Sequence, residues 1–254
     1  MRRGVLIALA VLCAAGALAA SAPGAPAAPG PPAAGSGSQQ DPVARGRGLF
    51  VEACSSCHGL DARGVPGRGP NLHGAGAAAA DFYLSTGRMP APVSDAEPLR
   101  AKPAYGPRET AALVAYVASL GPGPPVPDVQ PARGDVGEGL RLYTDRCAGC
   151  HQIAGAGGIV TGASVPSFKA TEPRQVGEAI RVGPHLMPKW SERAITPSEV
   201  DSIAAYVELT KDPVDAGGWG IGHIGPIPEG MVAWLLGGVA LLVVIRLIGE
   251  RMPR

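Results

Sequence analysis

Hydrophobic residues recur at helical spacing in two separate parts of this chain, and each stripe predicts an amphipathic helix. The first predicted helix covers residues 107–120 and is followed by Gly121, a residue typical of helix ends. The second begins at the run Thr196-Pro197-Ser198-Glu199. The stripes consist of Leu113, Tyr116, Val117 and Leu120 in the first helix and of Val200, Ile203, Ala204 and Val207 in the second. We interpret both as helices that face a core.

Sequence matches indicate that these helices close two copies of one unit. The matching residues are Gly46, Leu49, Phe50 and Ala115-Tyr116-Val117 in one copy and Gly139, Leu142, Tyr143 and Ala205-Tyr206-Val207 in the other. Start signals predict a helix at the opening of each copy, with Asp41 before a proline and Asp135 three residues before Glu138. The repeat predicts a first unit at residues 41–121 and a second unit at residues 133–213.

Each unit contains the pattern Cys-x-x-Cys-His, the attachment signature of c-type haem. Thiols three residues apart share a face of a helix, so both can form thioethers with the vinyl groups of one porphyrin, and the next histidine lies beneath the iron. The motif residues are Cys54, Cys57 and His58 in the first unit and Cys147, Cys150 and His151 in the second. We therefore expect two haem c groups, both covalently attached.

Motif spacing and composition disfavour two other kinds of ligand. Cys-x-x-Cys pairs also bind zinc, but zinc does not account for the histidine that follows the second cysteine in both copies. A formal net charge of +1, with 17% charged residues, gives no reason to expect nucleic acid as a partner.

One methionine in each unit is placed to be the second axial ligand. Met89 and Met187 are the two of the five methionines that lie between the apolar ends of the chain, and each precedes a proline. A thioether ligand raises the potential and leaves no open iron position for oxygen or peroxide. We expect the pairs His58 with Met89 and His151 with Met187. His185 is a competing ligand for the second iron, and packing in the core is the alternative role for either methionine.

A long apolar run lies near each end of the chain. The first follows two arginines and ends in small residues, which is typical of a signal peptide or an uncleaved N-terminal anchor, at residues 1–22. The second predicts a transmembrane helix at residues 230–249, with a buried core helix as the alternative. Arginines at its end place a tail, residues 250–254, in the cytoplasm. The protein would thus lie in membrane lipid, with its haem units on the extracytoplasmic side of the cell membrane.

Three segments without hydrophobic periodicity connect these parts. Residues 23–40 are rich in Ala, Pro and Gly and predict a disordered linker. The proline-rich residues 122–132 predict a stiff, extended spacer between the units. Residues 214–229 form a glycine-rich juxtamembrane segment, and residues 155–162 predict a loose loop inside the second unit.

Two runs in this sequence resemble a known family. Residues 78–90 (AAADFYLSTGRMP) and 225–235 (GPIPEGMVAWL) are similar to the dihaem cytochrome c subunit of the actinobacterial menaquinol–cytochrome c reductase, a cytochrome bc complex. The resemblance covers about residues 41–249. It implies an all-α protein of two tandem cytochrome c-type domains plus a C-terminal transmembrane helix. The motif cysteines and histidines and the two methionines match the haem positions of the family, whereas His185 departs from its pattern.

The resemblance also implies partners and a mechanism. Quinol is oxidised in a separate cytochrome b subunit, and an electron passes through a Rieske iron–sulfur subunit to one haem of this chain. The other haem passes it to a terminal cytochrome c oxidase. The chain would be the electron-transfer subunit of a quinol–cytochrome-c reductase, a translocase of the respiratory chain.

A short loop of the first unit resembles the loop of ordinary cytochromes c whose proline carbonyl orients the haem histidine. By that resemblance Pro70 would orient His58, and Pro166 is the looser candidate for His151. His73, in the same loop as Pro70, is expected to be a loop hydrogen-bonder and not an iron ligand.

Two alternative functions use the same motifs. One is a membrane-tethered dihaem carrier that serves another oxidase or dehydrogenase complex. The other is a dihaem peroxidase, which needs one iron with a vacant or displaceable ligand. Two methionine candidates argue against the peroxidase.

Overall fold

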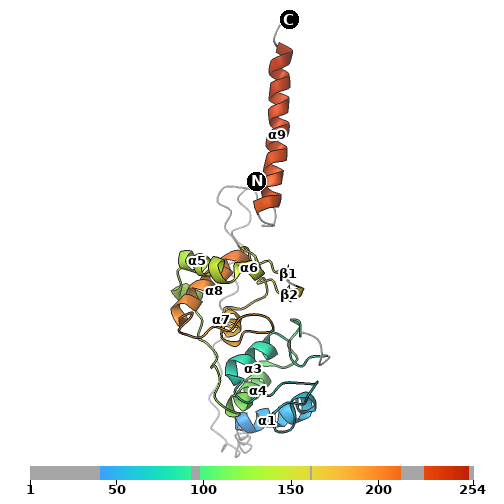
Figure 1. The fold of residues 1–254 in the computed structure, drawn as a ribbon, viewed down its shortest axis with the longest axis vertical. Coiled ribbons are helices and arrows are strands. Elements are labelled where there is room, and N and C mark those ends of the chain that lie inside the picture. Colours follow the sequence, from blue (N-terminus) through green and yellow to red (C-terminus); the bar gives the residue numbers. More distant parts are fainter. Residues whose placement is uncertain (1–40, 93–97, 161, 213–225, 252–254) are drawn as a thin grey trace, which may run out of the picture. The chain divides into compact units, whose positions relative to one another are not determined.

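The computed structural model describes residues 41–92, 98–160, 162–212 and 226–251. Helices dominate these residues, as the all-α class requires (Figure 1). The expected signal peptide or anchor, the linker at residues 23–40, most of the juxtamembrane segment and the end of the tail lie outside the described residues. The helices of the two units are α1 (Pro42–Ala53), α2 (Ser55–His58), α3 (Gly76–Ser85), α4 (Pro107–Ser119), η1 (Pro131–Arg133), α5 (Val136–Arg146), α6 (Ala148–His151), α7 (Pro173–Val182) and α8 (Pro197–Lys211).

The first and last helices of the first unit, α1 and α4, pack closely at a glycine. A Cβ atom on Gly46 would lie 2.0 Å from the carbonyl oxygen of Ala112, so only glycine allows this approach. Next to it, the rings of Phe50 and Tyr116 lie 5.1 Å apart and are tilted by 49°. Phe50, Leu113 and Tyr116 are buried in the core that this contact forms.

The second unit repeats this contact between α5 and α8. A Cβ atom on Gly139 would lie 2.0 Å from the carbonyl oxygen of Ser202. The rings of Tyr143 and Tyr206 lie 5.0 Å apart at 53°. The matches found in the sequence are therefore positions of one helix-packing arrangement, used twice.

The predicted helix starts agree with the structure at α1 and α8 and differ in one bond at α5. Asp41 caps α1, and Thr196 and Glu199 form the capping box of α8. Asp135 accepts from the backbone amide of Glu138 at 2.7 Å, as expected. The reciprocal bond is absent, because the Asp135 amide donates to the Ser202 hydroxyl of α8 at 3.1 Å instead.

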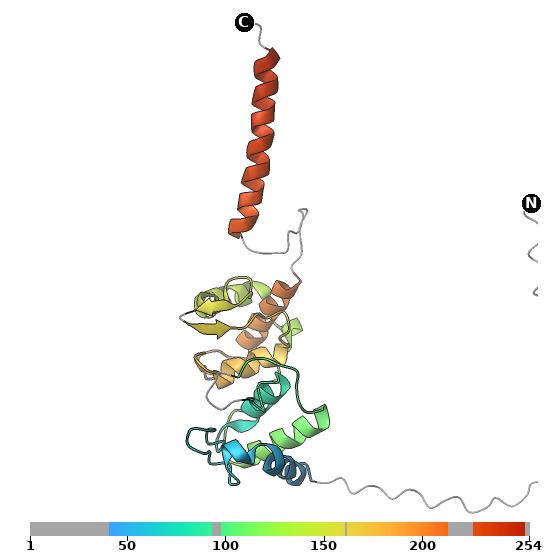
Figure 2. The ribbon, with the colours of Figure 1, turned by 90° about the vertical axis from the view of Figure 1, so that its right-hand side faces the viewer.

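The glycine-rich part of the second unit contains a hairpin that the sequence did not predict. Strands β1 (Gly158–Val160) and β2 (Ala163–Val165) pair antiparallel, with Gly158 opposite Val165 (Figure 2). The expectation of a loose loop was wrong here. Strands of three residues are too short to show the hydrophobic pattern by which strands are normally predicted, and backbone pairing defines this hairpin.

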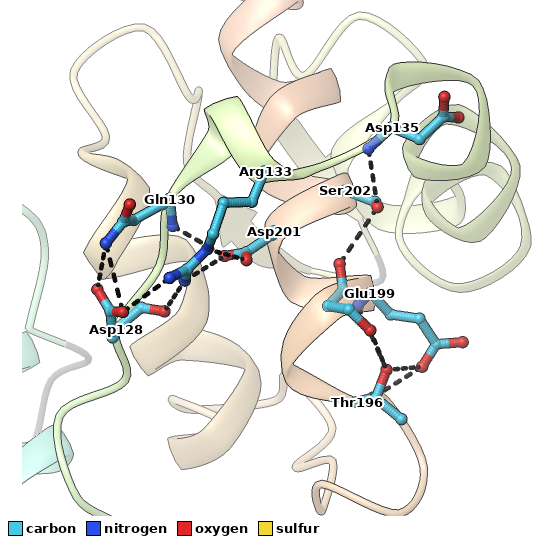
Figure 3. A network of polar contacts seen from close by, with 9 residues as sticks. Asp128, Gln130, Arg133, Asp135, Thr196, Glu199, Asp201 and Ser202 are labelled. Atoms are coloured by element: carbon cyan, nitrogen blue, oxygen red, sulfur yellow. Dashed lines mark hydrogen bonds and ion pairs between the residues drawn. The ribbon is translucent and has the colours of Figure 1, made fainter.

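The proline-rich segment between the units is attached to both of them. The Pro124 carbonyl accepts from the Ala78 amide of α3 at 3.0 Å. Further along, the buried carboxylate of Asp201 in α8 accepts from the Gln130 amide and from Arg133, both at 2.8 Å (Figure 3). The segment is therefore more than an extended spacer, because side chains fix its course.

Helices α3 and α7 join the two units. Arg174 of α7 lies 2.8 Å from the buried carboxylate of Asp81 in α3. Beside this pair, the Gln175 side chain donates to the Ser85 hydroxyl at 3.2 Å. Polar contacts that are partly shielded from water therefore hold the units together.

The C-terminal helix α9 (Pro226–Arg251) has the length and composition to cross a membrane. The apolar stretch extends over residues 229–250, and none of it is buried against the described residues. Trp234, for example, is 83% exposed. A core helix of a soluble protein would be mostly buried, so this exposure favours the membrane span over the core helix.

Candidate haem-binding sites

The first Cys-x-x-Cys-His motif forms the turn between α1 and α2. Cys54 ends α1, and the backbone amide of His58 donates to its carbonyl oxygen at 2.9 Å. His58 is buried, and its Nδ1 lies 2.8 Å from the carbonyl oxygen of Pro70. Because that carbonyl holds Nδ1, Nε2 is the nitrogen left for a metal. The expected partnership of Pro70 with His58 is confirmed.

The loop that carries Pro70 also accounts for His73. Its Nε2 lies 2.9 Å from the carbonyl oxygen of Asp61, and its backbone amide donates to Asn71 Oδ1 at 2.9 Å. His73 is thus a loop hydrogen-bonder, as expected.

Met89 follows α3 and packs on the core of the first unit. Its amide donates to the carbonyl oxygen of Tyr83 at 3.0 Å. Its side chain is partly buried against the same core as Cys54 and Leu72. The predicted thioether and one predicted attachment thiol of the first unit therefore share one hydrophobic surface.

The second motif lines a cavity of about 270 Å³. Cys147, Cys150, His151 and Met187 all lie on its wall. Phe168 stacks on the imidazole of His151, with ring centroids 4.6 Å apart and 26° between the planes. The structure thus brings together four side chains that the sequence singled out from two distant segments.

The histidine of the second motif is held less firmly than that of the first. Burial lowers the pKa of His151, and the backbone carbonyl of Pro166 opposes this shift. The Nδ1 atom is nevertheless buried without a partner of good hydrogen-bonding geometry among the described residues. Pro166 is therefore a looser partner than Pro70, and the ring is positioned mainly by Phe168.

The surroundings of the second motif suit an apolar prosthetic group. Burial raises the pKa of the Cys147 thiol to about 11, so the thiol is neutral near pH 7. Aliphatic and aromatic residues make up much of the wall, including Val165, Ile180 and Trp190. An apolar cavity with two thiols, an imidazole and a thioether fits a covalently attached haem.

His185 lies on the same cavity wall as Met187. It is exposed and has a φ of 53°, a left-handed conformation that is uncommon for residues other than glycine. The structure therefore keeps both residues beside the second motif.

Sequence reasoning missed the contribution of the first unit to this cavity. A pocket formed by segments far apart in the sequence has no characteristic residue spacing. The contact between α3 and α7 brings the segments of this pocket together. The lining residues from the first unit are Phe82, Tyr83, Arg88, Pro98 and Arg100.

Comparisons with known proteins assign both units. Residues 43–121 match the family model "Cytochrome c", and residues 134–207 match "Cytochrome C oxidase, cbb3-type, subunit III". Both units are therefore cytochrome c domains, which bind haem c covalently.

Curated relatives cover most of the chain. A protein of Corynebacterium diphtheriae is 35% identical over 237 residues, which are 84% of either chain. One of Mycobacterium tuberculosis is 39% identical over 81% of this chain and 77% of its own, and one of Mycobacterium leprae is 37% identical over 81% and 74%. All three are named "Cytochrome bc1 complex cytochrome c subunit". The present chain belongs to this family of cytochrome c subunits of the cytochrome bc1 complex.

Proposed function

We propose that this chain is the dihaem electron-transfer subunit of a quinol–cytochrome-c reductase, a translocase in which another subunit oxidises the quinol. It relays electrons from the Rieske iron–sulfur subunit, next to cytochrome b, to a terminal cytochrome c oxidase. The observation that carries the proposal is the cavity that gathers Cys147, Cys150, His151 and Met187 in a chain of this family.

The chain's own residues would hold two haem c groups, one in each unit. Haem c, when bound, supplies a reversible one-electron carrier. Each motif would provide two thioether bonds and one imidazole ligand, and each methionine would provide a thioether ligand to the iron. The thioether positions are Cys54, Cys57, Cys147 and Cys150, and the iron ligands are His58 and Met89 in the first unit and His151 and Met187 in the second.

These residues favour electron carriage over catalysis on a bound substrate. Pro70 fixes the tautomer and the orientation of His58 through its 2.8 Å contact. A methionine as the second ligand of the iron would leave no position for oxygen or peroxide and would raise the potential. The packed helices of the first unit bury His58.

Helix α9 would anchor the subunit in the cell membrane as a single C-terminal span. Arg246 lies near its end, 3.1 Å from Glu250, and further arginines follow in the sequence. By the positive-inside rule this end faces the cytoplasm, so both haem units face the extracytoplasmic side. The N-terminal apolar run would direct export, as a cleaved signal peptide or as a second anchor.

The test is affinity purification of the tagged chain from its native membranes in mild detergent. We expect cytochrome b and the Rieske protein to copurify, with quinol-dependent reduction of the haems and transfer to an oxidase. Purification with an oxidase or dehydrogenase alone would contradict the reductase assignment.

A membrane-tethered carrier of another oxidase is the second candidate. The match of residues 134–207 to a cbb3-type oxidase subunit model favours it. The identity of the copurified partners separates the two. A large shift of the reduced Soret band with carbon monoxide would instead indicate an open iron position and a peroxidase.

A further inference from the structure

The charged side chains on the wall of the cavity at the second motif are all cationic. Three arginines line it, and none of its described lining residues is acidic. Arg146 belongs to the second unit, whereas Arg88 and Arg100 come from the first. Guanidinium groups on a largely apolar wall favour a ligand that carries anionic groups, because guanidinium binds carboxylate or phosphate with strong, charge-assisted hydrogen bonds. The cavity is therefore built for a group that is apolar in bulk and negative at its edge.

Arg100 crosses from the first unit to the second. Its two terminal nitrogens donate to the carbonyl oxygen of Ala170 at 2.8 Å and to Gln175 Oε1 at 2.7 Å. Its Nε is buried without a hydrogen-bond partner among the described residues. Glu172 is an acidic group whose charge acts on Arg100, but it does not line the cavity. The N–H of Nε thus remains for a ligand.

Arg88 is held beside it by stacking. Its guanidinium carbon lies 5.0 Å from the centroid of the Phe82 ring, which also lines the cavity. This contact with an aromatic face keeps the guanidinium group of Arg88 at the cavity wall. The contacts between α3 and α7, including the 2.8 Å pair of Asp81 and Arg174, keep this wall in place.

We propose that the first unit completes the haem site of the second, with Arg88 and Arg100 binding the propionate carboxylates of the second haem. This inference rests on the proposed haem in that cavity. The vinyl groups of haem c are used in the thioether bonds. Its anionic substituents are the two propionates. Guanidinium groups bind carboxylates strongly and with defined geometry.

The consequence is that one unit sets the potential of the other's haem. Positive charge near the propionates offsets their negative charge, which otherwise favours oxidised iron. Neutralising either arginine should therefore lower the potential of the second haem. We expect a change of about tenfold in its reduction equilibrium, which is about 59 mV for a one-electron couple.

The experiment is a spectroelectrochemical titration of the full-length chain and its variants, together with a pyridine haemochrome count of haem per chain. Arg88→Gln and Arg100→Gln remove the charge. Arg100→Lys keeps the charge but loses the guanidinium geometry. Arg108→Gln is the matched control, on an exposed position of α4 that does not line the cavity. A Cys147→Ala/Cys150→Ala variant identifies which component of the titration belongs to the second haem.

The expected result is a lower potential of the second haem alone in both glutamine variants, near-normal behaviour of Arg100→Lys, and no change in Arg108→Gln. Loss of one haem from Arg100→Gln, with retention in Arg100→Lys, would also support the proposal. Two attached haems with unchanged potentials in both glutamine variants would overturn it and leave the proposed function intact. Equal haem loss in Arg100→Gln and Arg100→Lys would overturn it in favour of packing. A wild-type chain without covalent haem would overturn the proposed function itself.

Discussion

The two units of this protein have the same motif and the same helix contact but different surroundings. In the first, Pro70 holds His58, and the core beside Cys54 and Met89 comes from that unit alone. In the second, His151 stacks on Phe168, and the other unit supplies part of the cavity wall. Duplication therefore preserved the scaffold and let the two sites diverge. The first site is self-contained, whereas the second depends on its neighbour.

Removing the attachment cysteines should have the largest effect on this comparison. Small units bury little apolar surface without their prosthetic group. We expect the form with alanine at all four cysteines to be largely unfolded apart from α9, as measured by far-ultraviolet circular dichroism. Near-native helicity in that form would contradict the prediction.

Single-site removal sharpens the same prediction. Cys54→Ala with Cys57→Ala should destabilise mainly the first unit. Cys147→Ala with Cys150→Ala should destabilise both units, because residues of both units line the second cavity. Urea unfolding, monitored by limited proteolysis, would separate the two patterns. Equal effects of the two double variants would contradict the dependence of the second site on the first unit.

Replacing the two methionines tests whether the sites differ in ligation. Met89→Ala and Met187→Ala should each abolish one of two weak near-infrared bands from thioether-to-iron bonding, while the other band remains. His185→Ala is the control and should leave both bands. Survival of both bands in Met187→Ala would mean that methionine is not the ligand at the second site, with His185 as the first residue to test.

The two packing glycines test what the units still share. Gly46→Ala and Gly139→Ala each place a Cβ atom 2.0 Å from a backbone oxygen, so each should cost about 1–3 kcal/mol of unfolding free energy. Gly48→Ala is the control, because no atom lies within 4 Å of a Cβ there. It should stabilise α1 by up to about 1 kcal/mol. Thermal unfolding measures all three, and an unchanged Tm in either packing variant would contradict the prediction.

The carboxyl group of Glu178, between the units, should make the stability of the protein depend on pH. Glu178 is fully buried, and Arg174 also faces the carboxylate of Asp81 at 2.8 Å. Burial, reinforced by Asp81, raises the pKa of Glu178 from 4.5 to about 9. The folded state therefore binds this proton more tightly than the unfolded state. Its contribution to stability is complete below about pH 4.5 and is lost as the pH rises to about 9.

The substitution Glu178→Gln should make stability less dependent on pH over that interval. Urea midpoints at about pH 5 and about pH 9 would measure the difference. Glu52→Gln, at an exposed position of α1, is the control and should retain the wild-type dependence. An identical pH dependence in Glu178→Gln and wild type would mean that Glu178 titrates normally.

Local features of this fold were predictable from the sequence, whereas contacts between segments far apart in the sequence were not. Caps such as Asp41 and Thr196 act within one turn, so their residue types reveal them. The bond from Asp135 to Ser202 joins two helices and replaced the expected capping-box bond. The strands of hairpin β1–β2 are only three residues long, too short for a hydrophobic alternation to indicate them. Arg100 was missed for the same reason as Ser202, because its role depends on residues far away in the sequence.

The attachment of the proline-rich segment at both ends limits how this chain can vary in length. Pro124 is bonded to α3, and Gln130 and Arg133 are bonded to Asp201 of α8. The segment between these points could not accommodate an inserted residue while keeping both attachments. An insertion would have to break one attachment or displace one unit. The length of the segment between Pro124 and Gln130 should therefore vary little among relatives, and insertions should collect in loops that face solvent.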